Sequence, residues 1–133
     1  MYVKRLFYDD YADLQDFEKC MECPTWEDVE RVINKLDGKY TTQISMDNGD
    51  EDNYFCIGGG NAGLYNVFVS QNDNEIIYTL VNSDFKPSGM HKLVTGGQEG
   101  DFEDKYCISL EAAKTAAKTY FESGQLHDKF VWE

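Results

Sequence analysis

The spacing of apolar residues predicts a first main helix that begins after Thr25. Thr25 is a favourable N-cap residue, and Asp28 stands where it completes a capping box. The apolar residues that follow recur at steps of three and four, which places them on one helical face: Trp26, Val29, Val32, Ile33 and Leu36. Gly38 comes after the last of them and favours the left-handed conformation that ends a helix.

Two further segments have helical patterns. A second main helix is predicted to begin after Ser109, to run through an alanine-rich stretch and to end at Gly124. Within residues 9–22, three apolar residues at helical spacing predict a short helix: Tyr11, Leu14 and Phe17.

The segments around the helices have the two-residue period of strands. Predicted strands cover residues 2–8, 40–46, 54–57, 64–70, 76–81, 92–95 and 130–132. Short polar turns join most of them, which favours antiparallel pairing. The sequence therefore predicts an α+β fold, with a mostly antiparallel sheet of about six or seven strands and two main helices.

The glycine-rich segment 58–63 follows an apolar strand pattern. A phosphate-binding loop would need a helix after it, together with a lysine and a serine or threonine. Here another strand pattern follows, so we interpret the glycines as a tight turn or bulge that requires positive φ.

Length and composition indicate one domain, residues 1–133, with enough apolar material for a packed core. The net charge of -13 is the most unusual bulk property. A surface this acidic repels nucleic acids and anionic membranes and attracts basic proteins, although acidity also simply favours solubility. The chain has no apolar run near membrane-spanning length and no signal-peptide pattern, so a cytoplasmic location is predicted.

The reactive residue types form no familiar catalytic or metal-binding motif. Cys20 and Cys23 form a C-x-x-C pair, but a zinc site would need two more ligands at suitable spacing. The histidines, His91 and His127, have no partner in a nucleophile motif. We therefore predict no catalytic residue, no metal and no cofactor. The remaining cysteines and the tryptophans are predicted core residues: Cys56, Cys107, Trp26 and Trp132.

An ordered set of short motifs resembles a known protein family. The motifs are Trp26 to Gly38 ending in Leu-Asp-Gly, Ile57 to Gly60, Gly96 to Gln98, Ser109 to Ala113, Tyr120 to Gly124, and the closing Val131 to Glu133. This set resembles the first-numbered family of immunity proteins in bacterial polymorphic toxin systems. The resemblance covers roughly residues 24–133, and the acidic segment 1–23 lies outside it.

The resemblance implies an immunity protein that binds and neutralises a cognate secreted or contact-delivered toxin, encoded by the adjacent gene. A toxin that acts on nucleic acid, such as a deaminase or nuclease, has a basic cleft that an acidic protein can occupy without binding nucleic acid itself. Two alternatives remain: an acidic DNA mimic that inhibits another nucleic-acid enzyme, and a small α+β enzyme. A deep pocket with either histidine beside a carboxylate would favour the enzyme.

Two acidic segments, each expected to be a loop held at a sheet edge, are the predicted toxin-binding surface. The first supplies Asp47, Asp50, Glu51 and Asp52, and the second supplies Glu99, Asp101, Glu103 and Asp104. The second segment lacks the residue order of a calcium-binding EF-hand loop and is interpreted as a solvated acidic loop. A third acidic segment, residues 9–22, ranks behind these two.

Overall fold

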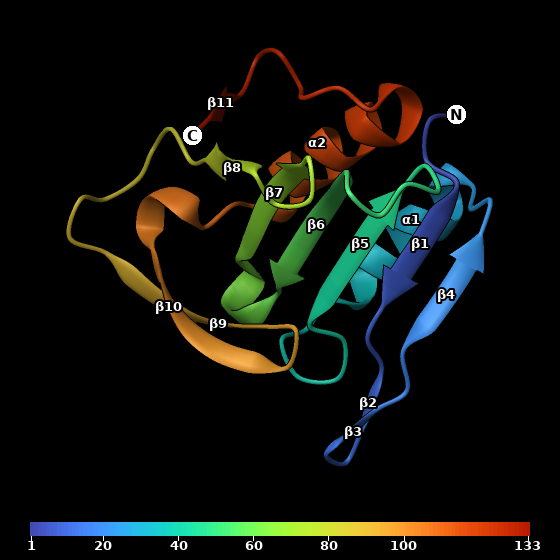
Figure 1. The fold of residues 1–133 in the computed structure, drawn as a ribbon. Coiled ribbons are helices and arrows are strands. Elements are labelled where there is room, and N and C mark those ends of the chain that lie inside the picture. The colour runs from blue at the N-terminus through green and yellow to red at the C-terminus, as the bar shows by residue number, and fades with distance from the viewer.

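The computed structural model describes all 133 residues, and a large sheet with two helices forms most of the fold (Figure 1). The sheet has seven strands in the order β11-β8-β7-β6-β5-β1-β4, and every neighbouring pair is antiparallel. Its strands are β1 (Arg5–Tyr8), β4 (Lys19–Glu22), β5 (Gln43–Asp47), β6 (Tyr54–Gly59), β7 (Tyr65–Gln71), β8 (Ile76–Val81) and β11 (Val131–Trp132). The helices, which both lie against one face of the sheet, are α1 (Trp26–Lys35) and α2 (Leu110–Ser123). The predicted α+β class is confirmed.

Two small sheets and two short 3-10 helices complete the chain. One small sheet is a hairpin of β2 (Tyr11–Ala12) and β3 (Gln15–Asp16), which projects away from the body of the molecule (Figure 1). The other pairs β9 (Met90–Thr95) with β10 (Gln98–Glu103). The 3-10 helices are η1 (Asn61–Gly63) and η2 (Asp104–Tyr106).

The core lies between the helices and the covered face of the large sheet. Along β6, Phe55 and Ile57 point into it, and their neighbours on β5 and β7 do the same. A single cluster of 20 buried residues joins these strands to α1 and α2. Leu6 belongs to this cluster because β1 lies inside the sheet between β5 and β4, and Val3, which precedes β1 and donates its backbone N–H to the Phe121 carbonyl, belongs to it as well. The N-terminal residues are therefore part of the same core.

Local signals set the ends of both helices. At α1 the Thr25 hydroxyl accepts from the Asp28 backbone N–H at 3.2 Å, and the Asp28 carboxylate accepts from the Thr25 backbone N–H at 2.9 Å. This reciprocal pair is the predicted capping box. At α2, Ser109 caps the start and left-handed Gly124 ends the helix, as predicted. Gly38 is also left-handed but lies in the turn after α1, which already ends at Lys35.

The predicted helix within residues 9–22 is wrong, because this segment forms the β2–β3 hairpin and then β4. Asp13 adopts φ of 58° at the tip, a conformation that a helix cannot contain. Across the hairpin, the Phe17 backbone N–H donates to the Asp10 carbonyl at 2.8 Å. The apolar spacing was misleading because Leu14 is 98% exposed and contributes nothing to the core.

The interpretation of residues 99–104 as a loop is also wrong. Residues 98–103 are β10 and pair with β9 along their whole length, with Asp101 directly opposite Lys92. Glu99, Asp101 and Glu103 alternate with Gly100 and Phe102, which is the two-residue period of a strand. Acidic character concealed a strand pattern here.

The glycine-rich segment is a turn that requires positive φ, as predicted. Gly59 and Gly60 have φ of 97° and 100°. Gly58 has a different role, since a Cβ added there would lie 2.5 Å from Thr95 Cγ2. The missing side chain lets β9 cross closely over this end of β6, and this crossing fixes the small sheet to the large one.

The predicted core residues divide into two groups. Cys56 and Cys107 are buried, as expected. The tryptophans are only half-buried and pack at the margin of the core: Trp26 lies against Phe121, with ring centroids 5.9 Å apart. Trp132 donates its indole N–H to the His127 carbonyl at 3.1 Å. Both tryptophans therefore seal an edge of the core and do not fill its centre.

Candidate functional site: the open face of the sheet

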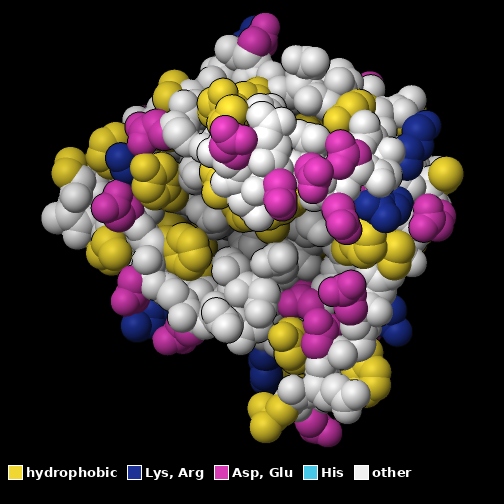
Figure 2. Space-filling model, viewed as in Figure 1, with side chains coloured by type: hydrophobic (Ala, Val, Ile, Leu, Met, Phe, Trp, Pro, Cys, Tyr) yellow, Lys and Arg dark blue, Asp and Glu magenta, His cyan; other side chains and the backbone are white.

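The face of the large sheet opposite the helices is open and hollowed. Alternation along the strands places Phe7, Gln43 and Ser45 on this face, where they form the floor of two adjoining depressions. The crossing of β9 and the β2–β3 hairpin bound it at one end, and the turn between β5 and β6 bounds it at the other (Figures 1 and 2). We call this concave region the hollow.

Three exposed carboxylates stand around the hollow: Asp16, Glu18 and Glu51. Asp16 comes from β3, Glu18 from the residues before β4, and Glu51 from the β5–β6 turn. None of them makes an ion pair within the chain. Figure 2 shows acidic side chains gathered at the rims of the hollow, with few basic side chains between them. The hollow therefore presents uncompensated negative charge.

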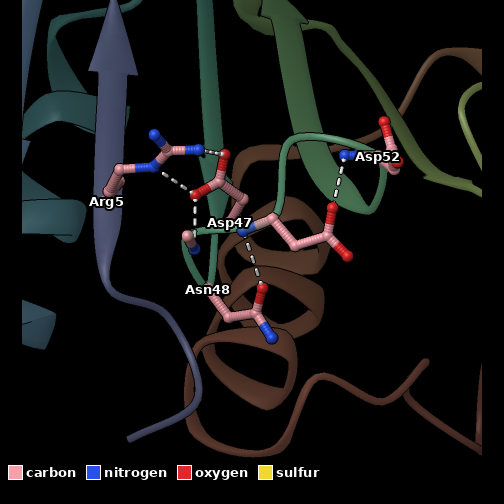
Figure 3. Close-up of polar contacts among 6 residues, drawn as sticks. Arg5, Asp47, Asn48 and Asp52 are labelled. Carbon is pink, nitrogen blue, oxygen red and sulfur yellow. Dashed lines mark hydrogen bonds and ion pairs between the residues drawn. The ribbon is translucent and has the colours of Figure 1, made fainter.

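Asp47 lines the hollow but is almost completely covered, and its carboxylate is engaged within the chain. It is only 4% exposed, and its two carboxylate oxygens accept from Nε and Nη2 of Arg5, both at 2.8 Å (Figure 3). The hydrogen bond and negative charge of Asp47 raise the pKa of Arg5. Asp47 also accepts from the Gly49 backbone N–H at 2.9 Å, so it holds the start of the turn that carries Glu51.

The β5–β6 turn is further ordered by its own side chains (Figure 3). Asn48 accepts from the Asp50 backbone N–H at 3.1 Å, and Asp50 accepts from that of Asp52 at 3.0 Å. Such side-chain to backbone bonds are the usual way in which Asn and Asp stabilise turns. The exposed carboxylates of this turn are thus held on an ordered support.

Sequence reasoning missed a neighbouring acidic turn. The Asp73 backbone N–H donates to the Asp52 carbonyl at 2.9 Å, which joins the β7–β8 turn to the β5–β6 turn. The two turns form one acidic ridge, whose members are Asp50, Glu51, Asp52, Asp73 and Glu75. The predicted meander contained the signal, because alternate turns of an antiparallel meander lie at the same end of the sheet.

The second predicted acidic segment lies elsewhere. Leu93 and Thr95 of β9 face β6, so Glu99, Asp101 and Glu103, which share the opposite face of the small sheet, point away from the large one. Lys92 partly compensates this outer face, since its Nζ lies 3.1 Å from Asp101 and 3.9 Å from Glu99. The structure therefore does not bring the two predicted acidic segments together.

Asp104, the last predicted contact, is engaged inside the fold. It accepts from the Lys86 backbone N–H at 2.6 Å and lies 2.6 Å from His91 Nε2. These two partners lower the pKa of Asp104. His91 thus lies beside a carboxylate, but neither His91 nor Asp104 lines a surface depression. His127 stacks on Phe130 with ring centroids 4.6 Å apart. Neither histidine therefore lies beside a carboxylate in a deep pocket, the arrangement that would have favoured an enzyme.

At the base of the hollow, the buried carboxylate of Asp9 joins separate segments by hydrogen bonds. Asp9 accepts from the backbone N–H groups of Thr42 and Gln43 at 2.7 and 3.0 Å, and from the Thr42 hydroxyl. That hydroxyl in turn accepts from the Gly97 backbone N–H at 2.9 Å. The side chains of Asp9 and Thr42 together therefore connect the hairpin base, the start of β5 and the β9–β10 turn.

The C-x-x-C pair is exposed and unbridged. Cys20 lies directly opposite Phe7 in the β1–β4 pair, so it belongs to the open face, while Cys23 follows the strand at a positive φ of 48°. No group of three or more His, Cys, Asp or Glu side chains is placed to hold a metal ion. That the pair is incidental stays a prediction.

The comparisons with known proteins gave one positive result. A family model described as "Immunity protein Imm1" matches residues 18–133, which is most of the chain. No curated protein and no solved structure matches. Neither helix is long and apolar enough to cross a membrane.

Proposed function

The chain belongs to the Imm1 family of immunity proteins, and we propose that it neutralises a cognate toxin domain by binding it over the hollow. In this proposal the toxin is encoded by the adjacent gene, acts on nucleic acid as a deaminase or nuclease does, and is met in the cytoplasm of the producing cell. The observation that carries the proposal is the set of exposed, unpaired carboxylates around a concave face: Asp16, Glu18 and Glu51.

Charge supports a basic partner. A toxin that handles nucleic acid needs basic residues to hold phosphates, and such a surface is attracted to a protein with a net charge of -13. Concave surfaces lined by one sign of charge focus this attraction and raise the association rate. Fast association suits a protein that must block a toxin before the toxin acts.

The ordered structure around the hollow also favours this face as the binding surface. Glu51 stands on a turn ordered by Asp47 and Asp50, and the hollow is braced at its base by Asp9. A partner that binds a preorganised surface avoids the entropy cost of ordering it. In the predicted set, Glu51 lines the hollow and Asp50 and Asp52 stand on the adjoining ridge, so these three remain proposed contacts.

The test is a charge-neutralised variant with Asp16→Asn, Glu18→Gln and Glu51→Gln. Its association with an inactivated form of the adjacent gene's toxin domain is measured by stopped flow over a salt series. We expect association at low salt to slow by roughly 10-fold, because three steering charges are removed, and its salt dependence to flatten. All three side chains are exposed, so thermal unfolding should change little.

The matched control removes the same number of charges from the outer face of β10, through Glu99→Gln, Asp101→Asn and Glu103→Gln. We expect a much smaller change in its association rate. Equal slowing in both variants would mean that overall charge, and not the hollow, attracts the toxin. An unchanged rate in the hollow variant would remove the hollow from the interface, and no binding by the wild-type protein would reject neutralisation of this toxin.

A further inference from the structure

We propose that the β2–β3 hairpin is an anchor that inserts Leu14 into an apolar pocket of the toxin domain, at a place where that pocket has a basic rim. This inference rests on the proposed toxin binding and adds a second contact with a different physical role. The hollow attracts the partner, whereas the hairpin slows its release.

The hairpin places apolar side chains far into solvent. Leu14 is 98% exposed at the tip, and Phe17, after β3, is 47% exposed. A single exposed leucine on a flat surface is ordinary. Here the leucine lies in the turn between β2 and β3, at the end of a hairpin that projects from the body of the molecule (Figure 1). Figure 2 shows hydrophobic, acidic and basic side chains together on this projection. The projecting shape suits insertion into a cavity.

The hairpin is fixed to the body of the protein. The Tyr11 backbone N–H donates to the Tyr40 carbonyl at 2.7 Å, and the Tyr11 ring packs so closely against Gly97 that a side chain there would collide with it. Within the hairpin, the Asp10 backbone N–H donates to the Asp16 carboxylate at 3.0 Å. The tip therefore has a defined position before binding, and little conformational entropy is lost when it inserts.

Charge and position indicate which partner the tip contacts. Asp13 and Asp16 flank Leu14, are exposed and make no ion pair within the chain, so the rim of a receiving pocket should be basic. Asp16 and Tyr11 also line the hollow. One basic partner seated over the hollow can therefore reach the tip. A side chain that fills a desolvated pocket, surrounded by contacts that exclude water, is the usual pattern of a binding hot spot.

The hairpin also stands apart from the part of the chain that the family shares. The family model matches from residue 18 onward, while β2 and β3 end at Asp16. The shared pattern therefore does not prescribe the sequence at the tip. We infer that the hairpin contributes to recognition of this protein's own toxin.

The test measures dissociation of the Leu14→Ala variant from the inactivated toxin domain of the adjacent gene. If the leucine is an anchor, its dissociation rate should rise by roughly 10- to 30-fold while its association rate changes less than about twofold. Met90→Ala, which truncates another exposed apolar side chain on the outer face of β9, should change neither rate. Leu14 buries nothing in the free protein, so the melting temperature of the variant should equal that of wild type.

The possible outcomes separate this inference from the proposed function. If wild type binds the toxin and Leu14→Ala dissociates at the wild-type rate, the anchor is rejected while toxin binding stands. If wild type does not bind, both proposals fail. Analytical ultracentrifugation tests whether Leu14 instead contacts a second copy of this chain. A dimer of wild type that Leu14→Ala abolishes would assign the leucine to that contact and overturn the anchor.

Discussion

The two faces of the large sheet come from the same strands but have different roles. On the covered face, Phe55 and Ile57 are fully buried against the helices. On the open face, Phe7 and Ser45 are only partly buried and form the floor of the hollow. Because strand side chains alternate, each strand contributes to stability with one set of residues and to the proposed binding surface with the other. The binding surface can therefore change without disturbing the core.

Phenylalanine occurs on both faces of the sheet, so one substitution type measures both roles. Phe55→Ala should lower the free energy of unfolding by about 3–5 kcal/mol, because it opens a cavity in the core. Phe7→Ala should lower it by only about 1–2 kcal/mol, because less of that ring is removed from water, yet it should weaken toxin binding. Urea unfolding and calorimetry measure the two effects. Equal losses of stability would contradict the division of roles.

Asp9 is an internal carboxylate that accepts hydrogen bonds, whereas Glu18 is an exposed carboxylate without a partner in the chain. Asp9→Ala leaves the backbone N–H groups of Thr42 and Gln43 without their acceptor, so it should cost about 1–3 kcal/mol of unfolding free energy. Glu18→Ala removes an exposed side chain that makes no hydrogen bond or ion pair within the chain, so its effect should stay within about 0.5 kcal/mol. Thermal unfolding of both variants measures the difference. A larger loss for Glu18→Ala would show that the hollow's carboxylates serve the fold.

The predictable parts of the fold were those set by local chemistry. Thr25 with Asp28 predicted the start of α1, and alternation predicted most strands of the large sheet, because these signals act over a few residues. The hairpin at residues 11–16 was missed, since Leu14 matched a helical period although it is exposed at a turn. Spacing alone cannot distinguish an apolar residue that packs from one that projects.

The candidate site was harder to predict because it depends on strand register. Asp47 appeared to be one more acidic turn residue, and only the pairing of β1 with β5 places Arg5 beside it, 42 residues away in the chain. In the same way, the β9–β10 pairing turns Glu99 and Asp101 to the outer face beside Lys92. Sequence located the negative charge, whereas register decides which carboxylates are free and which way they point.

A thiol already present on the open face can report whether the toxin binds there. Cys20 is exposed and lies opposite Phe7, whereas Cys56 and Cys107 are buried, and burial raises their thiol pKa values to about 12 and about 11. In a Cys23→Ser protein, only Cys20 should therefore react readily with an alkylating reagent. The measurement is its rate of alkylation, free and saturated with the inactivated toxin domain.

The control thiol is Glu103→Cys on the outer face of β10, in a protein with Cys20→Ser and Cys23→Ser. If the toxin covers the open face, its binding should slow alkylation of Cys20 by roughly 10-fold or more and leave the control thiol unchanged, because a buried interface excludes the reagent. Alkylation of Cys20 at the same rate in the free and saturated protein, with protection at Glu103→Cys instead, would contradict toxin binding over the open face and place the toxin on the small sheet.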